Sequence, residues 1–192
     1  MSAKPPQEKT SRKKSTGEYG EVTQPGTLRI QRILPGPMER VWAYLTESEK
    51  RAKWLAPGEM ELEVGGRLEL NWDHSGLSAE KTPPEKFAKA ECADTMHGTI
   101  TRCDPPRLLS YTWGEKPRIS EVTFELSPRG AGVLLVLTHR RLGDRTRIVS
   151  VASGWHTHLG ILSDHLNSRE PRLFWSTLAR LEKEYESRIL AL

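Results

Sequence analysis

The chain has 192 residues, of which 36% are hydrophobic and 28% are charged, a length and composition typical of one globular domain. No apolar run approaches the roughly 18 residues that cross a bilayer, so the sequence predicts a soluble protein without membrane insertion. The net charge of +4 lies in residues 1–17, which hold five Lys/Arg and one acid, because the remaining 24 basic and 24 acidic residues cancel. The body therefore shows no basic excess that would indicate a nucleic-acid partner.

The first 20 residues are basic and contain Pro and Ser, a composition typical of a disordered arm. They lack the apolar stretch of a signal peptide, so we expect a cytoplasmic protein with a disordered tail over 1–20 and one domain over 21–192. Cys92 and Cys103 are too few for a disulfide framework and too far apart for a zinc knuckle. We interpret them as structural thiols.

Strand-like alternation of apolar and polar residues recurs along the chain, separated by Pro- and Gly-rich turns. The segments are residues 27–34, 60–64, 67–74, 96–103, 108–113, 119–126 and 132–139. The turn at Gly65 and Gly66 predicts a hairpin between the second and third of these segments. Short connections between the later ones predict an antiparallel meander, whereas residues 75–95 have no sustained period and predict a long connection.

Apolar residues recur at helical spacing in two parts of the chain. Two short helices are expected after the first strand, over residues 37–46 and 47–55. From about Val151 the period is again helical, with an interruption near 167–171 and a second stretch that reaches Tyr185. The order predicts an α+β fold in which a curved antiparallel sheet of six to seven strands wraps around a long C-terminal helix.

Short motifs in a fixed order carry a resemblance to a known family over residues 27–188. They are Val41-Trp42-Ala43-Tyr44-Leu45-Thr46, Lys53-Trp54-Leu55, Val64-Gly65-Gly66-Arg67-Leu68, Asp104-Pro105-Pro106-Arg107-Leu108, Tyr111-Thr112-Trp113, Leu135-Val136-Leu137-Thr138-His139, Gly154-Trp155-His156-Thr157-His158-Leu159 and Phe174-Trp175. The chain resembles the START-like (SRPBCC) superfamily with its helix-grip fold, in the branch related to activators of the heat-shock-protein-90 ATPase. The resemblance implies a cavity between sheet and helix, but relatives include ligand-binding, lipid-transfer, cyclase-like and hydrolase-like proteins, so fold alone does not select a function.

Strand parity selects the side chains expected to face this cavity. One face carries Leu68, Leu70 and Trp72, and the same argument groups Leu109, Tyr111 and Trp113, and then Leu135, Leu137 and His139. Tryptophan offers a large apolar body with one N–H donor, which suits either a ligand cavity or a filled core. The predicted ligand-binding residues are Trp54, Trp72, Tyr111, Trp113, His139, Trp155 and His158, whereas we assign Trp42 to the core.

The histidines give little support to a metal site. His156 and His158 point about 200° apart on a helix, and His158 and His165 are separated by roughly 10 Å along its axis, so one ion cannot join either pair. No metalloprotease, nucleophile-elbow or phosphate-loop motif is present, and no cofactor is expected. His139 is a weak catalytic candidate, which would act as an acid or base together with Tyr111 or Arg102. The alternative is a structural role, in which its ring forms a hydrogen bond with a neighbouring backbone carbonyl.

Three functions remain open from the sequence. The first is a binding module for a small apolar molecule, with the loops near 54–58 and 75–95 as the entrance. The second is a cyclase- or hydrolase-like enzyme, which requires an acid/base residue such as His139 to face open volume. The third is a chaperone-regulating interaction protein, which requires a large exposed apolar patch. Monomer and homodimer are both compatible with the sequence.

Overall fold

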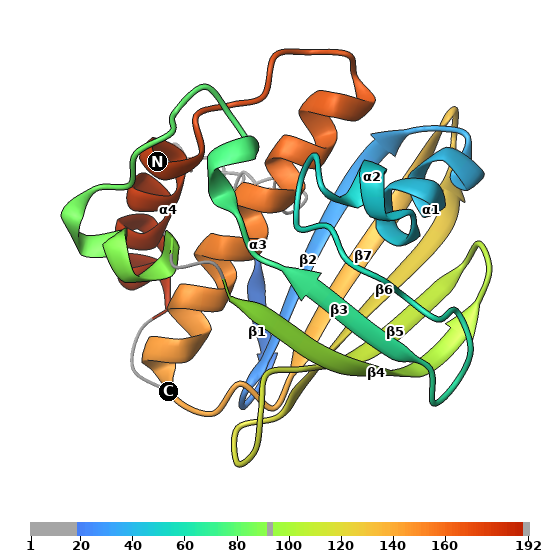
Figure 1. Ribbon diagram of the computed structural model, residues 1–192, viewed down its shortest axis with the longest axis horizontal. Helices are drawn as coiled ribbons and strands as arrows, with labels where there is room; N and C mark the ends of the chain where they lie inside the picture. Colours follow the sequence, from blue (N-terminus) through green and yellow to red (C-terminus); the bar gives the residue numbers. More distant parts are fainter. Residues whose placement is uncertain (1–18, 92–93, 190–192) are drawn as a thin grey trace, which may run out of the picture.

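The computed structural model describes residues 19–91 and 94–189 of the chain (Figure 1). The strands are β1 (Glu21–Gln24), β2 (Thr27–Pro35), β3 (Arg67–Asn71), β4 (Thr95–Asp104), β5 (Leu108–Trp113), β6 (Ser120–Arg129) and β7 (Gly132–Arg140). The helices are α1 (Met38–Thr46), α2 (Ser48–Arg51), α3 (Arg145–Leu166) and α4 (Phe174–Arg188), with the 3-10 turns η1 (His74–Gly76) and η2 (Glu85–Glu91).

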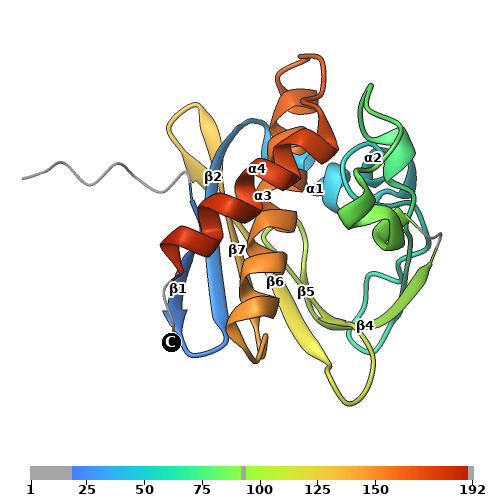
Figure 2. The ribbon, with the colours of Figure 1, turned by 90° about the vertical axis from the view of Figure 1, so that its left-hand side faces the viewer.

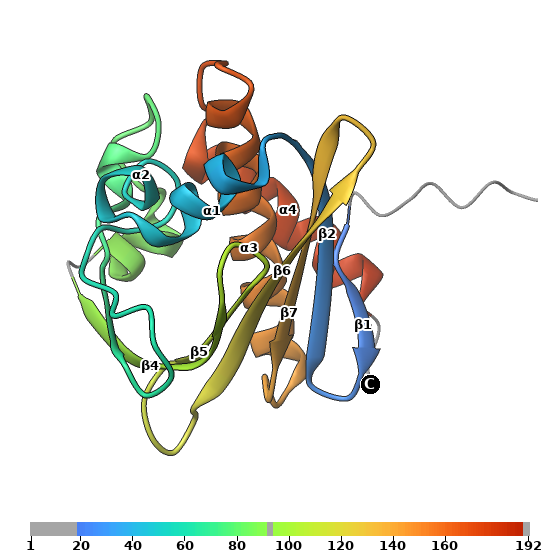
Figure 3. The ribbon, with the colours of Figure 1, turned by 90° about the vertical axis from the view of Figure 1, so that its right-hand side faces the viewer.

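All strands form one antiparallel sheet in the order β1-β2-β7-β6-β5-β4-β3. Figure 3 shows this sheet curving around α3, and Figure 2 shows α4 packed against the side of α3 that faces away from the sheet. The predicted α+β helix-grip fold, with two short helices after the first long strand, is confirmed.

The inner face of the sheet follows the parity that the sequence predicts. Tyr111 pairs with Val122 and Leu109 pairs with Phe124, and all four side chains are buried beneath α3. The inner residues of β7, which end at His139, are fully buried as well. Alternation works here because one face of the sheet packs against the helix while the other meets solvent.

The structure differs from the predicted elements at three places. Residues 60–64 are not a strand, because among the described residues of this segment only Met60 forms a bridge, to Leu68, while Leu62 and Val64 are exposed. The short edge strand β1 was not expected. Helix α3 begins at Arg145 rather than near 151, since the Asp144 side chain caps it by accepting the backbone N–H of Arg147 at 2.9 Å.

The predicted long connection is held against α4. The Ser78 hydroxyl accepts the backbone N–H of Phe174 at 3.1 Å, and the Glu80 carboxylate accepts both the backbone N–H and the hydroxyl of Ser176. These bonds satisfy backbone donors in the first turn of α4, which has no side-chain cap of its own. The segment 74–91 therefore lies against the first turn of α4 and, through His74, beside His158 of α3 (Figure 1).

Two expectations fall wholly or partly outside the described residues. The predicted tail lies outside them except for Tyr19 and Gly20, which bond to Glu184 and Tyr185 of α4. Cys92 also lies outside, while Cys103 is a half-buried free thiol. Among the described helices, none has both the length and the apolar character to span a membrane.

Candidate functional site

A cavity of about 350 Å³ opens between α3 and the β3–β5 side of the sheet. We call it the tryptophan cavity, and it is lined by Leu55, Trp72, His74, Asp94, Trp113, Ser150, Val151, Gly154, Trp155 and His158. Its volume lies at the lower end of the range for small-molecule sites. A mostly apolar wall with a few polar groups is the composition that such sites share.

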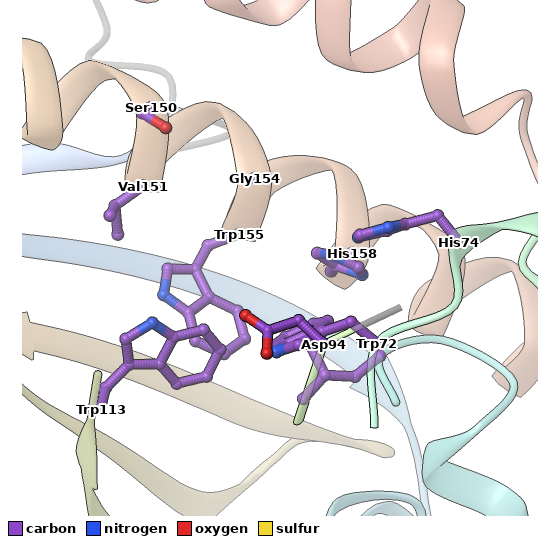
Figure 4. A pocket seen from close by; sticks show the side chains of 10 residues that line it. Trp72, His74, Asp94, Trp113, Ser150, Val151, Gly154, Trp155 and His158 are labelled. Carbon is purple, nitrogen blue, oxygen red and sulfur yellow. The ribbon is translucent and has the colours of Figure 1, made fainter. Parts of the chain in front are cut away.

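Three indole rings surround this space (Figure 4). Trp113, at the end of β5, lies 5.5 Å from Trp72 and 5.0 Å from Trp155 of α3, measured between ring centroids. The rings are inclined by 62° and 57°, so they meet edge to face rather than stacking into a closed block. This arrangement leaves ring surface available to a planar apolar guest.

Small residues on α3 keep the cavity open. Ser150, Gly154 and His158 follow at four-residue intervals and therefore lie on one face of the helix, as do Val151 and Trp155. No heavy atom lies within 4 Å of a Cβ built on Gly154, so a side chain here would enter open space. A larger residue at this position would fill the volume that a ligand needs.

His158 has a fixed tautomer. Its Nδ1 lies 2.6 Å from the carbonyl oxygen of Trp54, and since a carbonyl only accepts, Nδ1 carries the proton and Nε2 is a bare acceptor. Burial lowers the pKa of His158 to about 3, with a further contribution from His74, although the bond to Trp54 opposes the shift. The ring is therefore neutral at physiological pH.

The loop that fixes His158 is organised by a buried cation. The Arg51 guanidinium is fully buried and donates to the backbone carbonyls of Thr46, Ala56 and Gly58. Burial lowers the pKa of Arg51. These bonds hold the loop after α2 so that the Trp54 carbonyl faces α3 and fixes His158. The Trp54 side chain itself does not line the cavity.

His139 belongs to a closed hydrogen-bond chain. Its Nδ1 accepts the indole N–H of Trp155 at 2.9 Å, so its Nε2 donates to the Ser120 hydroxyl at 2.8 Å, and that hydroxyl donates to the Trp113 carbonyl. Burial, followed by the charges of Arg147 and Arg141, lowers the pKa of His139 to about 3. Both ring nitrogens are used, and His139 does not line the tryptophan cavity.

The structure brings together four of the seven predicted ligand residues: Trp72, Trp113, Trp155 and His158. Trp54 is fully buried with its N–H bonded to the Tyr44 carbonyl, and Tyr111 is buried beneath the helix, so these two and His139 lie behind the cavity wall. Neither Tyr111 nor Arg102 is among the hydrogen-bond partners of His139 within the described residues.

Sequence reasoning missed His74, Asp94 and the small residues of α3. The four-residue spacing of Ser150 and Gly154 before His158 was the available signal. His74 and Asp94 stand at the two ends of an aperiodic connection, where no pattern assigns a direction to a side chain. Within the described residues, no group of three or more His, Cys, Asp or Glu side chains is arranged to hold a metal ion.

Fold and cavity together define a helix-grip protein of the START-like superfamily. Residues 35–167 match the family described as Activator of Hsp90 ATPase homolog 1-like protein, and the chain belongs to that family. None of the curated proteins matches the chain.

Solved structures agree with this assignment. A Bordetella parapertussis protein is 45% identical, with a TM-score of 0.77 over 90% of this chain and 91% of its own. CalU16 from Micromonospora echinospora is 23% identical, with a TM-score of 0.62 over 84% of each chain. A Rhodobacter sphaeroides protein is 20% identical, with a TM-score of 0.60 over 79% of this chain and 98% of its own. The two more distant structures share the fold.

Proposed function

We propose that the protein binds a small, largely apolar molecule in the tryptophan cavity without transforming it. The observation that carries this proposal is the open space among Trp72, Trp113 and Trp155, which offers ring faces to a guest. Burying an apolar ring there removes its surface from water, at about 25 cal/mol per Å². The bare Nε2 of His158 supplies an acceptor that orients a ligand hydroxyl.

The acid/base residue expected for the enzymatic alternative does not line the cavity. A general acid or base works best with a pKa near the working pH and must reach the substrate. His139 lies outside the cavity lining, and the pKa of His158 is about 3, far from neutrality. A cyclase- or hydrolase-like reaction would therefore need a different proton carrier.

The interaction-protein alternative also lacks its expected surface. The exposed large apolar side chains within the described residues come from three segments of the chain: Ile33, then Leu62 and Val64, and then Leu173. Isolated exposed apolar residues are ordinary on protein surfaces. The tryptophan cavity therefore favours the binding function over the interaction function.

The test is equilibrium dialysis with 2-ethylnaphthalene, a neutral two-ring probe. Trp113→Ala removes one wall of the cavity and is expected to weaken binding at least tenfold, or about 1.4 kcal/mol. Trp42→Ala is the matched control, because Trp42 packs against the core from α1 and does not line the cavity. Equal affinities for wild type and Trp113→Ala would refute the proposal.

A further inference from the structure

A second hollow of about 160 Å³ adjoins the tryptophan cavity and shares His74 and His158 with it. We call it the helix compartment, because it lies between α3, α4 and the 74–91 connection. Its apolar wall consists of Phe87, Phe174, Trp175 and Leu178. An engineered cavity of roughly 150 Å³ in another protein accepts benzene, so a hollow of this size accepts a substituent of a few atoms.

The two hollows lie side by side along one face of α3. Ser150, Gly154 and His158 line both of them. The position of a Gly154 Cβ is open, so no side chain separates the hollows there. His74 lies 5.8 Å from His158 and 5.3 Å from Trp175 between ring centroids, which places it at the junction.

Two residues that line the helix compartment each carry a buried polar atom without a hydrogen-bond partner among the described residues. The Nε1 of Trp175 and the Nδ1 of His74 are buried and form no hydrogen bond within the described part of the chain. Trp175 itself is fully buried. Such atoms are rare in folded proteins because each one destabilises the fold, so an unpartnered one indicates a missing partner. An indole N–H only donates, and the partner of Trp175 must therefore be an acceptor.

Charge narrows the choice of acceptor. Asp94 lines the tryptophan cavity and forms no ion pair with the residues described here. Glu182 lines the helix compartment, where Lys86 pairs with it at 2.5 Å. Because Lys86 offsets the charge of Glu182, it is the Asp94 carboxylate that disfavours an anionic guest. The partner that remains is a neutral oxygen, such as that of a ketone, ether or hydroxyl.

We infer that the ligand is a neutral aromatic compound bearing an oxygen acceptor, which spans both hollows. Its ring lies among the tryptophans, and its oxygen enters the helix compartment and accepts the N–H of Trp175. This inference rests on the proposed function and adds the chemical class of the ligand. It also gives Trp175 a role in specificity that is separate from the packing of α4 against α3.

Three probes and one substitution test the hydrogen bond by equilibrium dialysis. 2-Acetylnaphthalene carries a ketone, 2-ethylnaphthalene lacks it, and 2-naphthoate replaces it with an anion. Trp175→Phe keeps an aromatic ring without the donor, and it is expected to weaken 2-acetylnaphthalene about tenfold and 2-ethylnaphthalene less than twofold. 2-Naphthoate is expected to bind wild type at least tenfold more weakly than the ketone. An equal effect of Trp175→Phe on ketone and hydrocarbon, or tight binding of 2-naphthoate, would overturn the inference.

A second substitution covers the case in which Trp175→Phe fails to fold. Leu178 lines only the helix compartment, so Leu178→Phe is expected to weaken 2-acetylnaphthalene about fivefold and to leave unsubstituted naphthalene unchanged. Unchanged binding of both probes would count against the spanning pose. If naphthalene binds and the substituted probes show none of these differences, only the inference fails. If no naphthalene binds wild type, the proposed function fails with it.

Discussion

Two buried histidines on the inner surface of the fold, His139 and His158, differ in what their second nitrogen does. Burial lowers the pKa of each to about 3. Both nitrogens of His139 are bonded, to Trp155 and Ser120, whereas among the described residues only Nδ1 of His158 has a partner, the Trp54 carbonyl. Burial and pKa are therefore poor guides to function in this protein. For the proposed binding function, the better guide is a hydrogen-bonding atom without a partner in a residue that lines a cavity.

The tryptophans divide in the same way. The N–H groups of Trp54 and Trp155 donate to the Tyr44 carbonyl and to His139, so both are satisfied inside the protein. The N–H of Trp175 is buried without an acceptor among the described residues. Satisfied donors stabilise the scaffold, and the unsatisfied one borders a hollow.

The largest expected effect is acid destabilisation, which both kinds of histidine share. The unfolded chain takes up protons near pH 6.5, whereas folded His139, His156 and His158 remain neutral until about pH 3. Their stabilising contribution is complete above pH 6.5 and is lost as the pH falls. The free energy of unfolding should drop by on the order of 5 kcal/mol between pH 7 and pH 5, as measured by urea denaturation. A flat profile would show that these rings are not buried.

His139→Ala should give the next largest effect, and on stability. It removes a buried ring and leaves the Trp155 N–H and the Ser120 hydroxyl without their partner. The expected loss is roughly 3 kcal/mol in urea denaturation at pH 7. Ser120→Ala, which removes the hydroxyl that accepts from His139 and donates to the Trp113 carbonyl, should cost about 1–2 kcal/mol. A loss below that of Ser120→Ala would mean that the chain does not stabilise the fold.

His158→Phe should act mainly on binding. The ring shape is retained while the Nε2 acceptor is lost, so affinity for 2-naphthol should fall about fivefold. 2-Methoxynaphthalene has no donor and should bind wild type and variant alike. Both affinities can be measured by equilibrium dialysis, with Trp42→Phe as the control. Equal losses for both probes would indicate that His158 acts only through its shape.

Gly154→Ala should give the smallest effect, with opposite signs in stability and binding. The added methyl group meets no heavy atom within 4 Å, and alanine favours the helix by up to about 1 kcal/mol. Its Cβ enters the space between the two hollows, so affinity for 2-acetylnaphthalene should fall about twofold. Thermal denaturation and dialysis measure the two changes. Increases in both stability and affinity would place the ligand elsewhere.

Much of the fold was predictable because a single buried sheet face imposes alternation. The parity of β5 and β7 was enough to place Tyr111 and His139 beneath the helix. The strand predicted over 60–64 is wrong beyond Met60, because alternation in Leu62 and Val64 carries no information when both side chains are exposed. A pattern predicts burial only where the fold supplies a partner surface.

The site was predictable in part. Strand parity placed Trp72 and Trp113 on the cavity side of the sheet. Parity could not show that Tyr111, on the same face, is buried beneath α3 and does not line the cavity. Hydrogen bonds between distant residues, such as that of His158 with the Trp54 carbonyl, leave no periodic trace. His74 and Trp175 meet only because the 74–91 connection docks on α4, a contact between segments about 100 residues apart.

The most direct test of the central claim uses the indole N–H resonances of the six tryptophans in a ¹H–¹⁵N correlation spectrum, assigned by single Trp→Phe variants. On addition of 2-acetylnaphthalene, the account predicts shifts for Trp72, Trp113 and Trp155, and a downfield shift for Trp175 as its N–H gains an acceptor. The resonances of Trp42 and Trp54 should stay in place, because neither ring lines a hollow. A spectrum in which the cavity tryptophans do not respond, or in which all six shift alike, would contradict it.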